Sequence, residues 1–251
     1  MKRIFLISCS ILALTACKNE KKDSEEMKST ENKKMEQTAE KQNDEWQNLF
    51  NGENLEGWKA YNKDSISDQW KAEDGVISFT PAEGERSASE NLISKKEFEN
   101  FELSIEWKIS EGGNSGIMWG VQEGEKYDEP YYTGPEIQVL DNQRHPDAKN
   151  GLNRTAGALY DMVPPSEDVT KPAGEWNKEV IHIDHNKNKG WVELNGKKVT
   201  EFPVNGDEWK EMVNNSKFKD WEDFGTSQSG HIALQDHGNK VWYRNIKIKE
   251  L

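Results

Sequence analysis

Cysteine is nearly absent from this 251-residue chain. The two cysteines that occur, Cys9 and Cys17, both lie before residue 18. From residue 18 onward there is therefore no thiol for a disulfide or for a thiolate metal site. A fold made by this part of the chain must be held by its apolar core. A domain of about 200 residues is large enough, since it buries roughly 70% of the surface that its unfolded chain exposes.

Long apolar runs are also scarce. The one marked run, residues 4–14, has about eleven residues and is too short to cross a hydrocarbon core ~30 Å thick. Lys2 and Arg3 precede it, which is the layout of an export signal, predicted here over residues 1–16. No later run approaches the ~20 residues that a membrane-spanning helix needs, so no other segment is expected to cross a bilayer.

The end of this signal, Leu14-Thr15-Ala16-Cys17, resembles the bacterial lipobox, in which small residues precede a cysteine that becomes lipidated. The resemblance implies a lipoprotein of the cell envelope, periplasmic or at the outer membrane, that contacts a membrane only through the lipid on Cys17. An ordinary signal peptide with a chance cysteine is the alternative.

Replacing Cys17 by Ser tests the anchor, because a hydroxyl does not take the place of the thiol in lipidation. We expect the Cys17→Ser protein to carry no fatty acid, whereas the unchanged protein is labelled. Metabolic labelling with a fatty-acid analogue measures this. Equal label on both proteins would contradict the prediction.

Aromatic residues are missing from residues 17–45, where Lys, Glu, Asp, Asn, Gln, Ser and Thr dominate. Such a segment cannot bury enough apolar surface to offset its ordering entropy, so a disordered tether is expected, with a surface helix as the alternative. The composition changes at Trp46, and all ten tryptophans lie in residues 46–251. These residues are predicted to form one folded domain.

Basic charge is in deficit: 33 Lys and Arg stand against 46 Asp and Glu, for a net charge of −13. Phosphate groups would be repelled, so neither nucleic acid nor an anionic lipid surface is an expected partner. The chain also lacks HExxH, GxSxG, the P-loop and the Rossmann glycine pattern, which excludes the enzyme classes that depend on those motifs.

The local patterns that are present favour β-strands. Residues 101–109 alternate apolar and polar side chains, as a half-buried strand does. Asp74-Gly75 and Asn195-Gly196 are turn pairs between apolar segments, and the second belongs to a predicted meander over residues 180–202. Residues 231–235 and 241–248 are expected to form a final hairpin, and only residues 207–218 look weakly helical. The chain is therefore predicted to be all-β, a sandwich or a barrel.

Three clusters carry side chains suited to chemistry. Residues 112–120 are rich in glycine and contain Asn114, whose amide both donates and accepts hydrogen bonds. Glu136 and Gln138 share one face of a predicted strand, near Trp119, Tyr131 and Tyr132, a composition common in sugar clefts. In the third cluster, His237 directly follows Asp236 and precedes Arg244 by seven residues. His237 is expected at the tip of the final hairpin.

Six short sequences then identify a resemblance. In order they are residues 50–58 (FNGENLEGW), 114–117 (NSGI), 136–141 (EIQVLD), 157–160 (GALY), 230–238 (GHIALQDHG) and 244–246 (RNI). Together they resemble the 3-keto-disaccharide hydrolase domain family over about residues 46–251. The resemblance implies a concanavalin A-like jelly-roll β-sandwich. It also implies cleavage of glycosides already oxidised to a ketone at sugar C3.

The ketone of such a sugar acidifies the proton on C2, so one base can start an elimination at C1. From the positions of the family's motifs we expect Glu136 and His237 to be the base and its partner, in either order, or joint ligands of a divalent cation. Hydroxyls or the enolate would be bound by Asn114, Gln138, Tyr160 and Arg244. Asp236 is also assigned to substrate binding, or it would orient His237 or start the turn. Elimination alone would make the enzyme a lyase, and water addition would make it a hydrolase.

Two other functions stay open. A non-catalytic, lectin-like sugar-binding module uses the same sandwich. A conventional glucanase needs two carboxyl groups about 5–9.5 Å apart, which requires Asp141 to turn inward beside Glu136. On a regular strand Asp141 points to the opposite face, so the two-carboxylate pattern is not evident.

Overall fold

The computed structural model describes residues 45–84 and 88–251. The predicted export signal, Cys17 and the predicted tether up to residue 44 lie outside the described residues. The described residues belong to one compact unit. The elements of this unit are almost all strands, and no helix in the described part of the chain is long and apolar enough to cross a membrane.

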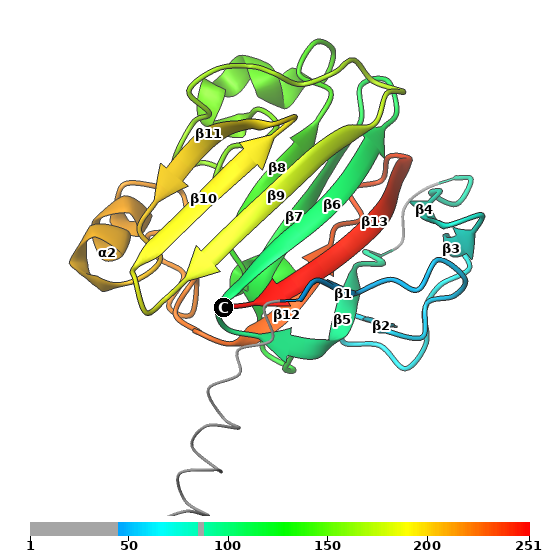
Figure 1. The fold of residues 1–251 in the computed structure, drawn as a ribbon, viewed down its shortest axis with the longest axis horizontal. Helices are drawn as coiled ribbons and strands as arrows, with labels where there is room; N and C mark the ends of the chain where they lie inside the picture. Colours follow the sequence, from blue (N-terminus) through cyan, green and yellow to red (C-terminus); the bar gives the residue numbers. More distant parts are fainter. Residues whose placement is uncertain (1–44, 85–87) are drawn as a thin grey trace, which may run out of the picture. The chain divides into compact units, whose positions relative to one another are not determined.

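Two antiparallel sheets make up the described domain (Figure 1). The larger has the order β11 (Lys197–Phe202), β10 (Lys189–Leu194), β9 (Asn177–Asp184), β6 (Phe101–Ile109), β13 (Val241–Glu250), β4 (Val76–Phe79), β3 (Trp70–Glu73), with β1 (Gln47–Asn48) also pairing β13. The smaller has the order β2 (Trp58–Ala60), β5 (Leu92–Phe98), β12 (Gly230–Leu234), β7 (Asn114–Val121), β8 (Glu136–Leu140). The helical elements are η1 (Pro130–Tyr132), η2 (Pro146–Asn150), η3 (Leu152–Arg154) and α2 (Gly206–Asn214).

The core lies between the two sheets. Along β6 every second residue, from Phe101 to Ile109, is buried, and the residues between them are half-buried. Ile117, Ile137 and Val139 of the smaller sheet join the same apolar cluster. Each large apolar side chain buried in this way stabilises the fold by about 1.5–3 kcal/mol. The predicted all-β sandwich is confirmed.

The two predicted turn pairs are also confirmed. Asp74 (φ 51°) and Gly75 (φ 77°) join β3 to β4, with Glu73 opposite Val76. Asn195 (φ 51°) and Gly196 (φ 84°) join β10 to β11. Positive φ at both central residues gives the turn a twist that matches the strands, and Asn, Asp and Gly tolerate that conformation best. The meander and the weakly helical stretch, which forms α2, are found as well.

The predicted final hairpin is wrong. β12 pairs with β5 and β7 in the smaller sheet, whereas β13 pairs with β6, β4 and β1 in the larger one. Residues 235–240, which join the two strands, therefore cross from one sheet to the other. A turn-like sequence specifies a local change of direction, but strand partners are chosen by packing of the whole sandwich. His237 consequently lies in a crossover and not at a hairpin tip.

Candidate active site

A cavity of about 370 Å³ brings most of the predicted site residues together. The described residues that line it are Asn114, Tyr131, Tyr132, Glu136, Gln138, Tyr160, Lys217, Phe218, Trp221, Gln235 and His237. Asn114 begins β7, and Glu136 and Gln138 lie on β8. Because strand side chains alternate, these carboxyl and amide groups face away from Ile137 and Val139, which fill the core. The predicted convergence of Asn114, Glu136 and His237 is confirmed.

Gly116 makes room for the Glu136 carboxyl. The two residues lie on adjacent strands, with Gly116 paired to Gln138 and Met118 paired to Glu136. A Cβ atom added to Gly116 would lie 2.0 Å from Oε1 of Glu136. No side chain can occupy that space without displacing the carboxyl. Gly116, the glycine of the 114–117 sequence, therefore leaves the space that the Glu136 carboxyl occupies.

The Glu136 carboxyl is the one acidic group among the described residues that line the cavity. Burial raises its pKa to about 8, although the charge of Lys217 opposes this shift and that of Asp147 adds to it. The carboxyl makes no hydrogen bond with any residue in the described ranges, and the residue is 8% exposed. At neutral pH it therefore holds a proton that it can donate to a ligand.

His237 lies beside Asn114. Nε2 of His237 is 3.5 Å from Nδ2 of Asn114, and the His145 ring stands nearly perpendicular to the His237 ring at 6.2 Å between centroids. The crossover that carries His237 is tied to β7, since the Asn114 backbone N–H donates to Oδ1 of Asn239 at 3.1 Å. The imidazole is thus held at the cavity by the register of two segments far apart in sequence.

Two residues of the cavity wall have a buried amide oxygen without a hydrogen-bond partner among the described residues. These oxygens are Oδ1 of Asn114 and Oε1 of Gln235. Leaving a buried acceptor unpaired costs about 1–3 kcal/mol, and such groups in folded proteins usually await a ligand or a water. Hydroxyl donors of a sugar satisfy acceptors of this kind. Gln235 was not among the predicted site residues, although it stands in the sequence 230–238.

Tyr160 supports the site through both its backbone and its ring. Its N–H donates to the backbone oxygen of Glu136 at 2.9 Å, which holds the free edge of β8. Its hydroxyl donates to Oδ2 of Asp147 at 2.8 Å, and Asp147 also pairs with Arg154 at 3.1 Å. The hydroxyl is therefore engaged, and Tyr160 presents its ring to the cavity.

Aromatic rings form one wall of the cavity. Tyr132 and Trp221 lie 4.9 Å apart between ring centroids, and Tyr131 packs against both. Sugar rings commonly stack on such surfaces. Tyr131 and Tyr132 were expected near the site, whereas Trp119 instead stacks on Phe202 in the core at 5.8 Å. Lys217, Phe218 and Trp221 come from a segment that showed no recognisable motif.

Two predicted ligand-binding residues do not line the cavity. Arg244 lies on β13 of the other sheet, where its guanidinium pairs with Glu106 at 2.8 Å and stacks on Trp176 at 4.1 Å. The prediction that Arg244 binds substrate in this site is therefore corrected. Asp236 accepts hydrogen bonds from the backbone N–H groups of Gly238 (2.7 Å) and Glu90 (2.9 Å). Its observed contacts shape the crossover, as the turn alternative expected.

Asp141 does not turn inward beside Glu136. Its carboxylate accepts from the backbone N–H groups of Gly112 (2.8 Å) and Gln143 (3.1 Å) and pairs with Arg144 at 3.3 Å. It therefore holds the loop before β7 and does not line the cavity. The second carboxylate that a conventional glucanase needs is not supplied from this position.

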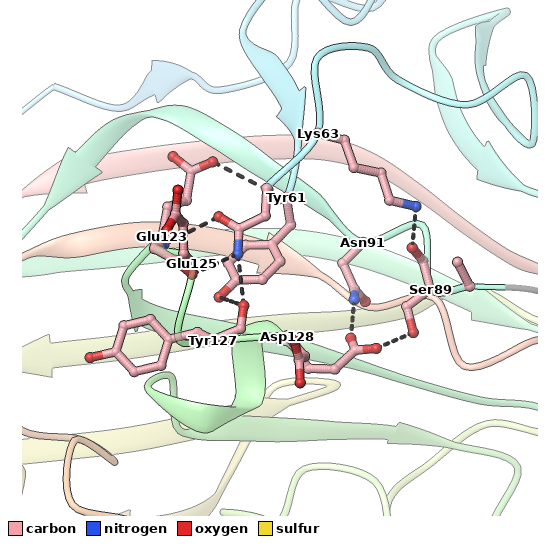
Figure 2. Close-up of a pocket in the computed structure, with 12 residues that line it drawn as sticks. Tyr61, Lys63, Ser89, Asn91, Glu123, Glu125, Tyr127 and Asp128 are labelled. Carbon is pink, nitrogen blue, oxygen red and sulfur yellow. Dashed lines mark hydrogen bonds between the residues drawn. The ribbon is translucent and has the colours of Figure 1, made fainter.

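A larger cavity of about 730 Å³ is a weaker candidate (Figure 2). Its polar groups bond to one another, and Figure 2 shows the side chain of Lys63 pointing to Ser89. Lys63 donates to the backbone oxygen of Ser89 at 2.7 Å, and Asn91 donates to Glu129 at 2.7 Å. Asn62 likewise donates to the backbone oxygen of Tyr127 at 2.7 Å. These groups already have partners, whereas the smaller cavity presents unpaired acceptors and a protonated carboxyl.

A divalent cation held by Glu136 and His237 would need further ligands. Within residues 45–84 and 88–251 no group of three or more His, Cys, Asp or Glu side chains is placed to hold a metal ion. The unpaired oxygens of Asn114 and Gln235 are further atoms in the cavity wall that could ligate a metal ion. Such oxygens suit hard cations and sugar hydroxyls alike.

Known proteins that are similar to this chain agree with the fold described above. A family model, the 3-keto-alpha-glucoside-1,2-lyase-like domain, matches residues 45–249. A 3-keto-disaccharide hydrolase of Bacteroides thetaiotaomicron is 40% identical over 228 residues, which are 81% of this chain and 77% of that protein. Two crystal structures from Parabacteroides distasonis, both provisionally assigned as glycosyl hydrolases, are also similar. One is 34% identical with a TM-score of 0.76, covering 83% of this chain and 95% of the other. The second is 30% identical with a TM-score of 0.63, covering 82% and 100%. The chain belongs to the family of 3-keto-alpha-glucoside-1,2-lyase-like domains.

Proposed function

We propose that this protein is an enzyme that cleaves 3-keto glycosides or disaccharides by elimination. One observation carries the proposal: a single protonated carboxyl, Glu136, and an imidazole, His237, converge on a cavity whose described wall has no second carboxylate. Acetal hydrolysis by the usual glycosidase route needs two carboxyl groups. Elimination from a 3-keto sugar needs one base and one acid.

The two groups take different roles because their surroundings differ. His237 removes the C2 proton as the general base. Glu136, which keeps its proton at neutral pH, protonates the oxygen that leaves from C1. The sequence left both orders open, and this is the order that we propose. Departure of the leaving group gives a C1=C2 double bond in a 3-keto glycal. Addition of water to that bond makes the net reaction a hydrolysis, and release of the glycal makes it a lyase reaction.

The rest of the wall binds the sugar. The unpaired oxygens of Asn114 and Gln235 accept hydrogen bonds from hydroxyl groups. The side-chain oxygen of Gln138 already accepts from the N–H of Val139 at 3.0 Å, so its amide donors are the groups left for substrate. Tyr131, Tyr132 and Trp221 stack on the leaving group. We further propose that the domain acts in the cell envelope, anchored through Cys17.

A sugar-binding module without activity is the second candidate, and the aromatic wall is the observation that favours it. A lectin would bind an oxidised and an unoxidised sugar and change neither. An enzyme that eliminates must leave the unoxidised sugar intact, because no carbonyl acidifies its C2 proton.

The test compares a glucoside with its 3-keto form, each carrying deuterium at C2, in the presence of the purified protein. We expect cleavage of the 3-keto sugar alone, with a slower rate for the deuterated form or loss of deuterium to water. Release of the leaving group and mass spectrometry of the sugar measure both. Equal turnover of the two sugars with full retention of deuterium would show ordinary acetal hydrolysis and refute the proposal. Binding without any turnover would support the lectin.

A further inference from the structure

The segment after α2 brings a lysine to the cavity. Lys217 lines it, and its backbone N–H donates to Oδ2 of Asp161 at 2.9 Å. The next residue, Phe218, is buried and stacks on Phe224 at 3.9 Å between ring centroids. These contacts fix the start of the Lys217 side chain on both sides.

The ammonium of Lys217 lies over aromatic rings and not beside a carboxylate. Nζ is 4.3 Å from the centroid of the Tyr160 ring and 5.0 Å from that of Phe218. Within the described ranges it forms no ion pair. Although the residue as a whole is exposed, burial of the ammonium lowers the pKa of Lys217 despite the nearby acidic groups. Desolvation without a direct ion pair leaves a cation that gains from contact with an anionic ligand.

Two of the acidic groups around Lys217 share a single arginine as their ion-pair partner. Asp161 pairs with Arg154 at 2.7 Å, and Asp147 pairs with the same guanidinium at 3.1 Å. Glu136 is uncharged at neutral pH because burial raises its pKa to about 8. The two carboxylates and the one guanidinium leave a charge of −1, which the Lys217 ammonium balances in number without forming an ion pair. With Arg244 in the other sheet, Lys217 is the one Lys or Arg among the described residues of the cavity wall.

The proposed elimination creates a negative charge that such a cation fits. When the base takes the C2 proton, the electron pair of the C2–H bond forms a C2=C3 bond, and the C3=O pair moves onto oxygen. That enolate then re-forms the C3=O bond, the C2=C3 pair shifts to C1=C2, and the C1–O bond breaks. The leaving oxygen takes a proton from Glu136, so that atoms and charge balance.

We propose that the Lys217 ammonium binds the C3 oxygen of the 3-keto sugar and stabilises the enolate. This inference rests on the proposed function, and it makes Lys217 a catalytic residue through direct contact with a reacting atom. A fixed cation aimed at developing charge in a desolvated site acts as an oxyanion hole does, and its removal costs about 100- to 1,000-fold in rate.

The experiment measures two rates in the purified protein and in its Lys217→Gln, Lys217→Arg and Lys217→Ala variants. One is exchange of the C2 hydrogen of a 3-keto glucoside in deuterium oxide, and the other is release of the leaving group. We expect Lys217→Gln to lower both rates by about 100-fold or more. Lys217→Arg should retain part of the activity, and added ethylamine should partly restore Lys217→Ala. Lys219→Gln, an exposed neighbour outside the cavity wall, is the matched control and should change neither rate.

The outcomes separate this inference from the proposed function. If the protein without any substitution neither exchanges the C2 hydrogen of the 3-keto sugar nor cleaves it, the proposed function and the role of Lys217 are both overturned. An active unchanged protein whose Lys217→Gln variant exchanges within about 3-fold of its rate would overturn the role of Lys217 alone. Trapping of Lys217 by borohydride in the presence of the 3-keto sugar would also overturn it, because a lysine that stays an ammonium forms no Schiff base with the ketone.

Discussion

Replacing Glu136 by Gln or His237 by Ala should each lower the rate of 3-keto glycoside cleavage by roughly 100-fold or more, the usual size of a general acid or base contribution. The two losses should differ in kind. A nitrophenolate leaves without protonation, whereas an alkoxide does not. We therefore expect Glu136→Gln to affect a 3-keto alkyl glucoside much more than a 3-keto nitrophenyl glucoside. His237→Ala should affect both alike, because both need loss of the C2 proton.

The pH profile gives the same assignment independently. The pKa of Glu136 is raised to about 8 by burial, so the acid is present below that pH and disappears above it. Cleavage of the alkyl glucoside should therefore fall as the pH rises through about 8, and cleavage of the nitrophenyl glucoside should fall less. Glu125→Gln and His182→Ala, which lie outside the cavity wall, are the controls. Equal losses on both substrates in Glu136→Gln would contradict the acid role.

A chelator separates a direct base from one that acts through a cation. If Glu136 and His237 bind a divalent ion, added chelator should reproduce the loss seen in His237→Ala, and restoring the ion should reverse it. If His237 takes the proton itself, the chelator should leave the cleavage rates of the 3-keto alkyl and the 3-keto nitrophenyl glucoside unchanged. Elemental analysis of the purified protein gives a second measurement of the same question.

Replacing Glu179 by Gln should stabilise the protein at alkaline pH and leave it nearly unchanged at about pH 5. Glu179 is fully buried on β9, where Nε1 of Trp107 donates to one carboxyl oxygen and the other has no partner among the described residues. Burial raises the pKa of this carboxyl from 4.5 to about 8. The folded protein therefore keeps a proton that the unfolded chain has already released.

The sign follows from that difference. Between about pH 4.5 and 8 the unfolded chain gains from ionising Glu179 and the folded protein does not, so the free energy of unfolding declines as the pH rises. At 1.36 kcal/mol per pKa unit the decline is on the order of 2–5 kcal/mol by about pH 8.5. The side chain of the Glu179→Gln variant cannot ionise, so the variant escapes this part of the decline. Its amide resembles the protonated carboxyl that the folded protein holds.

Denaturant unfolding at about pH 5 and about pH 8.5 measures the effect. We expect the Glu179→Gln protein to exceed the unchanged protein in stability at the higher pH only. Glu125→Gln, an exposed carboxyl, should show no pH-dependent difference. If the stability difference for Glu179→Gln were the same at both pH values, the prediction would be wrong. Glu179 would then not be a carboxyl that ionises in the unfolded chain and stays protonated in the folded protein.

The sequence by itself determined the strands and much of the site. Alternation of period two is a local property, because successive side chains of an extended chain point to opposite faces. It therefore located β6 and placed Glu136 beside Gln138 on the face away from the core. The turns at Asp74-Gly75 and Asn195-Gly196 are equally local, since they depend on the conformations that these residues tolerate.

Only the tertiary structure decided which strands pair and which distant segments meet. The stretch from β12 to β13 has the local pattern of a hairpin, yet burial of both strands in different sheets turned it into a crossover. That crossover carried His237 to the cavity and left Arg244 on the opposite sheet. Lys217 and Trp221 reached the wall from a segment about 80 residues after β8 in the sequence. Contacts at such separations depend on how the whole core packs, which no local pattern encodes.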